Sequence, residues 1–197
     1  MIAKDYSYFQ EVINIVNPYL EKENIKILHL GQDSSPLDNT LNLNNKTSIS
    51  QCAFIIKRSL LHFGNDSWMC HYAGAEDIPL VSLYGPTTIN NHSPFFYNKD
   101  KTIFLESHRN GNKATFSREE NPKTIDFIHS EDVAAAVLKL LNIPYILTNK
   151  TLFIGNLYNN KMVHSIPNQI VDTNRLGLQS LIVRMDIDFN EENLIKQ

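Results

Sequence analysis

The chain has 197 residues, 42% hydrophobic and 20% charged, with a formal net charge of −3 at pH 7. This composition excludes collagen-like, low-complexity and wholly disordered proteins, and no apolar run is long enough to predict a membrane span. The absence of a basic stripe argues against dedicated nucleic-acid binding. The two cysteines, Cys52 and Cys70, are too few for a disulfide scaffold or a zinc site, and indicate reduced thiols in the cytosol.

The N-terminal third of the chain alternates helical and extended patterns. Apolar residues at helical spacing predict a helix over Tyr6–Leu20, and a short apolar run predicts a strand over Ile25–Leu30. The polar stretch 32–45 predicts a loop. Ser48 and Gln51 have the spacing of a capping box, so a second helix should begin there.

The same alternation continues through the middle of the chain. A strand is predicted at Leu60–Phe63, then a helix capped by Asp66 or Ser67 and ending near Glu76, then a strand at Leu80–Tyr84. Alternating helices and strands with short connections predict an α/β fold, a Rossmann-like parallel sheet with covering helices. We therefore expect the first three predicted strands to be parallel neighbours in one sheet.

The rest of the chain predicts one more strand and one more helix before a change of composition. Thr102–Glu106 fits a strand, residues 107–122 fit a long surface loop, and Ser130 is placed to cap a helix up to Leu141. We expect residues 1–147 to form one domain and residues 148–197 a short α+β extension or the start of a further module. In that extension strands are predicted at 151–154 and 181–184, and a helix at 191–195.

Two turns of the predicted domain carry the residues best suited to bind an anion. In an open parallel sheet, ligands bind outside the carboxyl ends of the strands, and a helix N-terminus offers free N–H groups and the positive end of a dipole. This places a diphosphate at the turn before the third helix and at the turn after the third strand. The candidate residues are Asp66, Ser67, His71, Gly85, Pro86 and Thr87.

Each of these residues also has a purely structural interpretation. Asp66 or Ser67 can be an ordinary helix cap, His71 a core histidine, and Gly85-Pro86 only a turn. For His108, Arg109 and Arg118 in the long loop, a solvated surface is the better interpretation than a phosphate contact. The remaining histidines show no metal-ligand spacing, so we expect no metal and no cofactor.

The same residues, taken in order, resemble glycosyltransferase family 9, the heptosyltransferases. The resemblance rests on Asn65-Asp66-Ser67-x-x-x-His71, Ala73-Gly74-Ala75 and Leu83-Tyr84-Gly85-Pro86-Thr87, with weaker matches at Ile27–Gly31, Lys46–Ile49 and Ile128–Val133. It covers roughly residues 5–142 and corresponds to the C-terminal, donor-binding half of a GT-B fold. In that family the matched turns surround the diphosphate of a nucleotide sugar.

The resemblance implies an enzyme that transfers a sugar, by analogy heptose, from a nucleoside-diphosphate donor to a hydroxyl acceptor on a glycan or lipid-linked substrate. It also implies a cytoplasmic location, or a peripheral one at the inner membrane, in lipopolysaccharide biosynthesis. Trp68 departs from the family, which usually has Gly there. The family's N-terminal half, and the strand whose loop supplies a basic residue to the diphosphate, have no counterpart in this sequence.

Two other functions remain open at this stage. A non-catalytic module that binds a nucleotide sugar or assembles with a partner would account for the lack of an acceptor half. A GT-B nucleotide-sugar epimerase shares the architecture, but uses carboxylates and histidines between its halves. The catalytic base, the sugar and the acceptor are not specified by the sequence.

Overall fold

A computed structural model describes residues 2–32, 35–147, 150–153 and 162–165. The chain divides into two compact units, residues 1–147 and 148–197. That the first unit binds a nucleotide sugar, and that the second is an extension or a further module, stay predictions. The first unit contains all of the candidate site residues.

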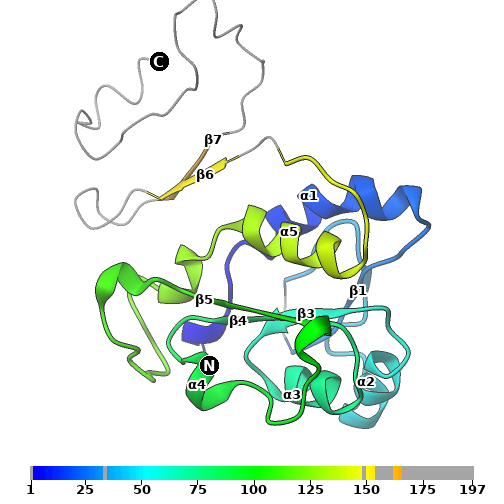
Figure 1. Ribbon diagram of the computed structural model, residues 1–197, viewed down its shortest axis with the longest axis horizontal. Coiled ribbons are helices and arrows are strands. Elements are labelled where there is room, and N and C mark those ends of the chain that lie inside the picture. The colour runs from blue at the N-terminus through cyan, green and yellow to red at the C-terminus, as the bar shows by residue number, and fades with distance from the viewer. Residues whose placement is uncertain (1, 33–34, 148–149, 154–161, 166–197) are drawn as a thin grey trace, which may run out of the picture. The chain divides into compact units, whose positions relative to one another are not determined.

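A three-stranded parallel sheet forms the centre of the first unit (Figure 1). It consists of β3 (His62–Asn65), β4 (Leu80–Tyr84) and β5 (Thr102–Glu106), in that order. Gly64 lies opposite Ser82 on β4, and Ser82 lies opposite Phe104 on β5. All five residues of β4 are buried, as expected for a central strand covered on both faces. The predicted α/β class is confirmed, and so is the parallel pairing of the second and third predicted strands.

The strand predicted at Ile25–Leu30 is shorter and has a different partner. Its core, β1 (Leu28–His29), pairs in parallel with β2 (Leu41–Asn42) in a separate two-stranded sheet. The expectation that it neighbours the other strands in one sheet is therefore wrong. Leucines at positions 41 and 43 alternate with asparagines inside the predicted loop, and the N–H groups of these leucines donate to the carbonyls of Ile27 and His29 at 2.8 and 2.9 Å.

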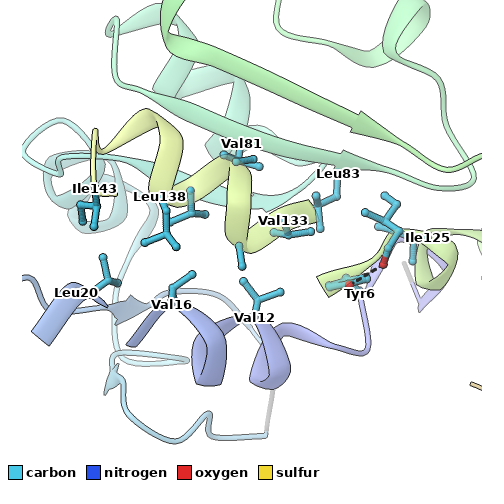
Figure 2. Close-up of a cluster of buried hydrophobic side chains, with 14 residues drawn as sticks. Tyr6, Val12, Val16, Leu20, Val81, Leu83, Ile125, Val133, Leu138 and Ile143 are labelled. Atoms are coloured by element: carbon cyan, nitrogen blue, oxygen red, sulfur yellow. Dashed lines mark hydrogen bonds between the residues drawn. The ribbon is translucent and has the colours of Figure 1, made fainter. Parts of the chain in front are cut away.

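Two pairs of helices cover the central sheet on opposite faces (Figure 1). On one face, α1 (Phe9–Lys22) and α5 (Ser130–Leu140) bury the larger core, in which Val12 faces Val133 and Val16 faces Leu138 (Figure 2). On the other face, α2 (Ile49–Ile56) and α3 (Trp68–Ala75) form a smaller cluster; its buried members are Ile56, Cys70, Ala73 and Leu80. The apolar spacing that predicted the first helix is thus the spacing that packs it.

The helix starts differ in how they are capped. The capping box at Ser48 and Gln51 is present, with each side chain bonded to the other's backbone N–H. Ser130, predicted to cap the last helix, is instead its first residue; the N-cap position is His129, which forms no side-chain cap bond. The acidic first turn of α5 still complements the helix dipole.

Short elements complete the described chain. In the first unit these are η1 (Ile2–Lys4), α4 (Ile89–His92), η2 (Lys99–Lys101), η3 (Arg109–Gly111) and η4 (Thr124–Phe127). In the second unit, β6 (Lys150–Phe153) and β7 (Met162–Ser165) pair antiparallel. The strand predicted at 151–154 overlaps β6, and the elements predicted at 181–184 and 191–195 lie outside the described residues.

The segment before α1 is joined to the segment before α5 by long-range hydrogen bonds. The Tyr6 hydroxyl donates to the Ile128 carbonyl at 2.7 Å. The Ser7 N–H and hydroxyl donate to the two carboxylate oxygens of Asp126 at 2.9 and 2.8 Å. Nearer the N-terminus, the Ala3 N–H donates to the Arg118 carbonyl at 3.0 Å. These bonds hold η1 in a fixed place, which determines where Lys4 can reach.

The core between α1 and α5 predicts a clear contrast between two leucines. Leu138 is fully buried and Leu60 is 62% exposed. We expect Leu138→Ala to lower the free energy of unfolding by about 2–5 kcal/mol, because it deletes buried methyl groups and leaves a cavity. Leu60→Ala should cost well under 1 kcal/mol. Urea denaturation measures both, and similar losses for the two variants would contradict the described core.

Candidate functional site

The two predicted turns lie together at the carboxyl edge of the central sheet. β3 ends at Asn65 and leads into α3, while β4 ends at Tyr84 and leads through Gly85 towards α4. Because the strands are parallel neighbours, these ends meet at one edge. The backbone joins them directly, since the Asp66 N–H donates to the Leu83 carbonyl at 3.1 Å.

Asp66 is a buried carboxylate at the centre of this edge, only 6% exposed. Its Oδ2 accepts from the Thr87 hydroxyl at 2.9 Å and from Lys4 Nζ at 2.5 Å. A buried charge needs such partners, because removing it from water costs more than burial of the side chain returns. Asp66 therefore connects the end of β3, the turn after β4 and the N-terminal segment.

Lys4 is a site residue that the sequence analysis missed. No basic residue was expected there, yet η1 brings the Lys4 ammonium to Asp66, where it also lies 3.5 Å from the Asp66 carbonyl oxygen. The Lys4 side chain is 18% exposed. No sequence pattern marks this lysine among the 18 basic residues. Its position follows from the bonds of the N-terminal segment to the region before α5.

The first turn of α3 has no side-chain cap. Ser67 occupies the N-cap position but forms no capping hydrogen bond, unlike Ser48 at the start of α2. Within the described chain, the N–H groups of Trp68 and Met69 form no hydrogen bond, whereas the Ser67 backbone is hydrogen-bonded to the Cys70 side chain. Such amides at the positive end of a helix dipole are suited to bind an anion.

Gly85 is required by a close approach of the chain behind the site. A Cβ at this position would lie 2.5 Å from the backbone N and Cα of Ile125 in η4. The next residue, Pro86, accepts from the Phe116 N–H at 2.9 Å. The turn is therefore held between η4 and the loop that precedes it, and no larger residue fits at Gly85.

Two residues of α3 lie on its outer side. His71 is exposed, so the alternative of a core histidine is wrong, and no contact to Asp66 or Thr87 is present in the described part of the chain. Trp68 is 40% exposed and its ring centroid lies 6.5 Å from that of Tyr72, one turn along the helix. The structure thus brings together Asp66, Thr87 and Lys4, and leaves His71 apart from them.

Arg109 does not have the solvated surface position that its sequence context predicts. Its side chain is 9% exposed, and it donates from Nε to the Gly85 carbonyl at 2.7 Å and from Nη2 to the Thr87 carbonyl. Its Nη1 pairs with Glu106 at 2.7 Å. The surface prediction holds for Arg118 and His108, which are exposed.

Two other titratable side chains near the sheet, Cys70 and His62, are uncharged at neutral pH. Burial raises the pKa of the Cys70 thiol to about 11, so the thiol is protonated and a poor nucleophile at neutral pH. Burial lowers the pKa of His62 to about 4, so this side chain is neutral at pH 7. Among the described residues, no group of three or more His, Cys, Asp or Glu side chains could hold a metal ion.

A parallel sheet covered by helices on both faces, with helix and turn amides at its carboxyl edge that form no hydrogen bond in the described chain, defines the unit as a Rossmann-like α/β domain. Residues 10–125 match the family model described as glycosyltransferase family 9 (heptosyltransferase). The chain therefore belongs to this family. The matched residues extend from α1 to η4, so they include Asp66, Thr87 and Arg109 but not Lys4.

Two solved structures share the fold. A glycosyl transferase family 9 protein from Veillonella parvula is 19% identical with a TM-score of 0.57, and the match covers 72% of this chain and 43% of that chain. The ADP-heptose LPS heptosyltransferase II of E. coli is 19% identical with a TM-score of 0.51, over 71% and 43% of the two chains. This chain thus matches less than half the length of either protein.

No curated protein matches the sequence. As for membranes, none of the helices in the described ranges combines the length and apolarity that a membrane span requires.

The packing behind Gly85 predicts a difference between two glycines at neighbouring strand ends. A Cβ at Gly64 would meet only the His62 ring, with Nε2 at 3.5 Å and Cε1 at 3.8 Å, which are ordinary contacts. We expect Gly85→Ala to lower the free energy of unfolding by at least about 1–3 kcal/mol, because the backbone of Ile125 must move. Gly64→Ala should change it by less than about 1 kcal/mol. Equal thermal stability of the two variants would show that the turn is not confined as described.

Proposed function

We propose that residues 1–147 bind a nucleoside-diphosphate sugar by its diphosphate and act as the donor-binding half of a GT-B glycosyltransferase. The observation that carries the proposal is the uncapped first turn of α3 beside the turn after β4. In the described chain the N–H groups of Trp68 and Met69 in the first of these turns, and of Thr88 in the second, form no hydrogen bond, and Lys4 contacts Asp66 at the same edge of the sheet. Membership of glycosyltransferase family 9 supports the same conclusion.

The electrostatics of this edge favour an anion. The negative charge of Asp66 is neutralised by Lys4 at 2.5 Å, so the carboxylate repels a bound phosphate less than an unpaired carboxylate would. The Lys4 ammonium has three N–H groups; two face oxygens of Asp66, which leaves a third for a phosphate oxygen. The amides of α3 add the positive end of the helix dipole.

The side chains of the proposed site then have separate roles. Lys4 and the backbone N–H groups of Trp68 and Met69 bind phosphate oxygens. Thr87 donates its hydroxyl to Asp66, so it holds the two turns together instead of donating to the ligand. His71 and Pro86 flank the turns, and Gly85 permits their close packing against Ile125.

In the proposed reaction the acceptor hydroxyl attacks the anomeric carbon of the sugar, and the bond to the diphosphate breaks. The leaving diphosphate is stabilised by preorganised amides and Lys4, an oxyanion-hole type of catalysis that needs no metal. A single displacement inverts the anomeric configuration. The base that takes the hydroxyl proton, and the acceptor site, belong to a second GT-B half outside the described unit.

The E. coli relative suggests the substrates. Its title names ADP-heptose and lipopolysaccharide, and by analogy we propose an ADP-linked heptose donor and a lipid-linked glycan acceptor. The corresponding location is the cytoplasm or the cytoplasmic face of the inner membrane. The experiment below also includes nucleotides with other bases, because no contact among the described residues identifies the base.

Calorimetric titration of the full chain with ADP, UDP and GDP, in the absence of divalent metal, tests the proposal. We expect at least one nucleotide to bind, and Lys4→Met to weaken it roughly 10- to 150-fold, because a charge-assisted hydrogen bond contributes about 1.5–3 kcal/mol. Lys26→Met is the matched control, since Lys26 is exposed and far along the chain from the site residues.

Removal of Lys4 alone leaves Asp66 buried without its cation, so the double variant Lys4→Met with Asp66→Asn serves as a second test. It removes both charges and keeps the Thr87 contact available. The double variant should fold and still bind weakly. If the wild-type chain is folded and binds none of the three nucleotides, or if Lys4→Met and Lys26→Met bind equally well, the proposed site is wrong.

A further inference from the structure

Arg109 is a buried arginine whose donors face the backbone of the turn after β4. It donates from Nε and Nη2 to the carbonyls of Gly85 and Thr87, which are two residues apart. Its remaining nitrogen, Nη1, donates to the Glu106 carboxylate. Arginine is almost never buried unless it is paired, and its planar fork is suited to fix several acceptors in one geometry. No other described side chain donates to these two carbonyls.

The backbone conformation at residues 107–109 directs the Arg109 side chain to the turn after β4. Ser107 extends the β4–β5 ladder by donating its N–H to the Tyr84 carbonyl at 2.8 Å. Arg109 then adopts a φ of +49°, in the left-handed region that non-glycine residues rarely occupy. Its own N–H donates to the Ser107 hydroxyl at 3.2 Å. An unfavourable conformation of this kind is retained where the surrounding contacts require it.

The contact with Thr87 sets the direction of the next amide. The peptide bond after Thr87 is trans, so the Thr88 N–H points to the side opposite the Thr87 carbonyl, which faces Arg109. In the described chain the Thr88 N–H has no hydrogen bond. The following N–H, of Ile89, donates to Glu106 Oε2 at 2.9 Å. The Arg109–Glu106 pair therefore fixes the backbone on both sides of the free Thr88 amide.

We infer that Arg109 is a positioning residue that orients the Thr88 N–H towards the diphosphate of the donor. The inference rests on the proposed function and assigns a further determinant of the same site. Because Glu106 neutralises it at 2.7 Å, Arg109 acts through the turn and not as a phosphate ligand. Lysine cannot replace it, since one ammonium cannot reproduce the forked contacts to two carbonyls and a carboxylate.

Nucleotide binding to the 197-residue variant Arg109→Lys tests this role against the control Arg118→Lys. The Arg118 side chain is exposed. The probe is whichever of ADP, UDP or GDP binds the wild type most tightly, titrated calorimetrically below the unfolding temperature of every variant. We expect Arg109→Lys to weaken binding about 10-fold or more, and Arg118→Lys to stay within twofold.

An amide readout distinguishes positioning from a general loss of stability. In ¹⁵N-labelled protein, nucleotide should shift the Thr88 and Met69 amide resonances of the wild type. In Arg109→Lys the shift at Thr88 should be lost while that at Met69 persists. If Arg109→Lys does not fold, Glu106→Gln replaces it and should weaken binding several-fold with the same selective loss at Thr88.

The outcomes separate the two proposals. Wild-type binding together with an Arg109→Lys variant that binds within twofold of it, or a Thr88 resonance that still shifts in that variant, overturns the role of Arg109 alone. A folded wild type that binds no nucleotide overturns the proposed function, and with it this inference.

Discussion

The buried carboxylate of Asp66 is the constraint on which the arrangement of the site depends. A carboxylate removed from water must be paired, and Asp66 finds its partners in two segments far from it in sequence. Lys4 lies 62 positions before it and Thr87 lies 21 positions after it. Satisfying this one charge fixes the N-terminal segment, the start of α3 and the turn after β4 against each other.

The remaining charges near the site are also compensated within the protein. Arg109 pairs with Glu106 and donates to backbone carbonyls, so its charge is used to hold the turn. What is left for a ligand is a set of backbone amides, those of the first turn of α3 and of Thr88, and one N–H of Lys4. We propose that a site built in this way recognises the oxygens of a phosphate by fixed hydrogen-bond geometry, with little mobile charge to reorganise on binding.

Local sequence patterns predicted the parts of the fold that depend on local chemistry. β4 and β5 have the bounds that the sequence predicts, and the capping box at Ser48 is present. The weaker predictions concern pairings between distant segments. The segment that contains β2 fits a loop by its polar composition, because Asn42 and Asn44 alternate with Leu41 and Leu43, and the predicted partner of β1 is therefore wrong.

The candidate site shows the same difference between residues that a local pattern identifies and residues that only long-range contacts bring into place. The turn residues Asp66 and Thr87 could be proposed from their positions after parallel strands, because carboxyl ends of such strands meet at one edge. Lys4 and Arg109 could not, since each reaches the site only through contacts made over long sequence distances. Arg109 was assigned to solvent because a basic residue in a polar loop is normally exposed; only the carbonyls of Gly85 and Thr87 make its burial favourable.

The central claim is that a diphosphate binds at the edge organised by Asp66, and a crystal structure of the full chain with a nucleoside diphosphate tests it most directly. The account predicts phosphate oxygens at hydrogen-bond distance from the first-turn amides of α3 and from Lys4 Nζ, with the Asp66–Thr87 hydrogen bond retained. A diphosphate bound elsewhere on the unit, with the α3 amides and Lys4 not contacting it, would contradict the account.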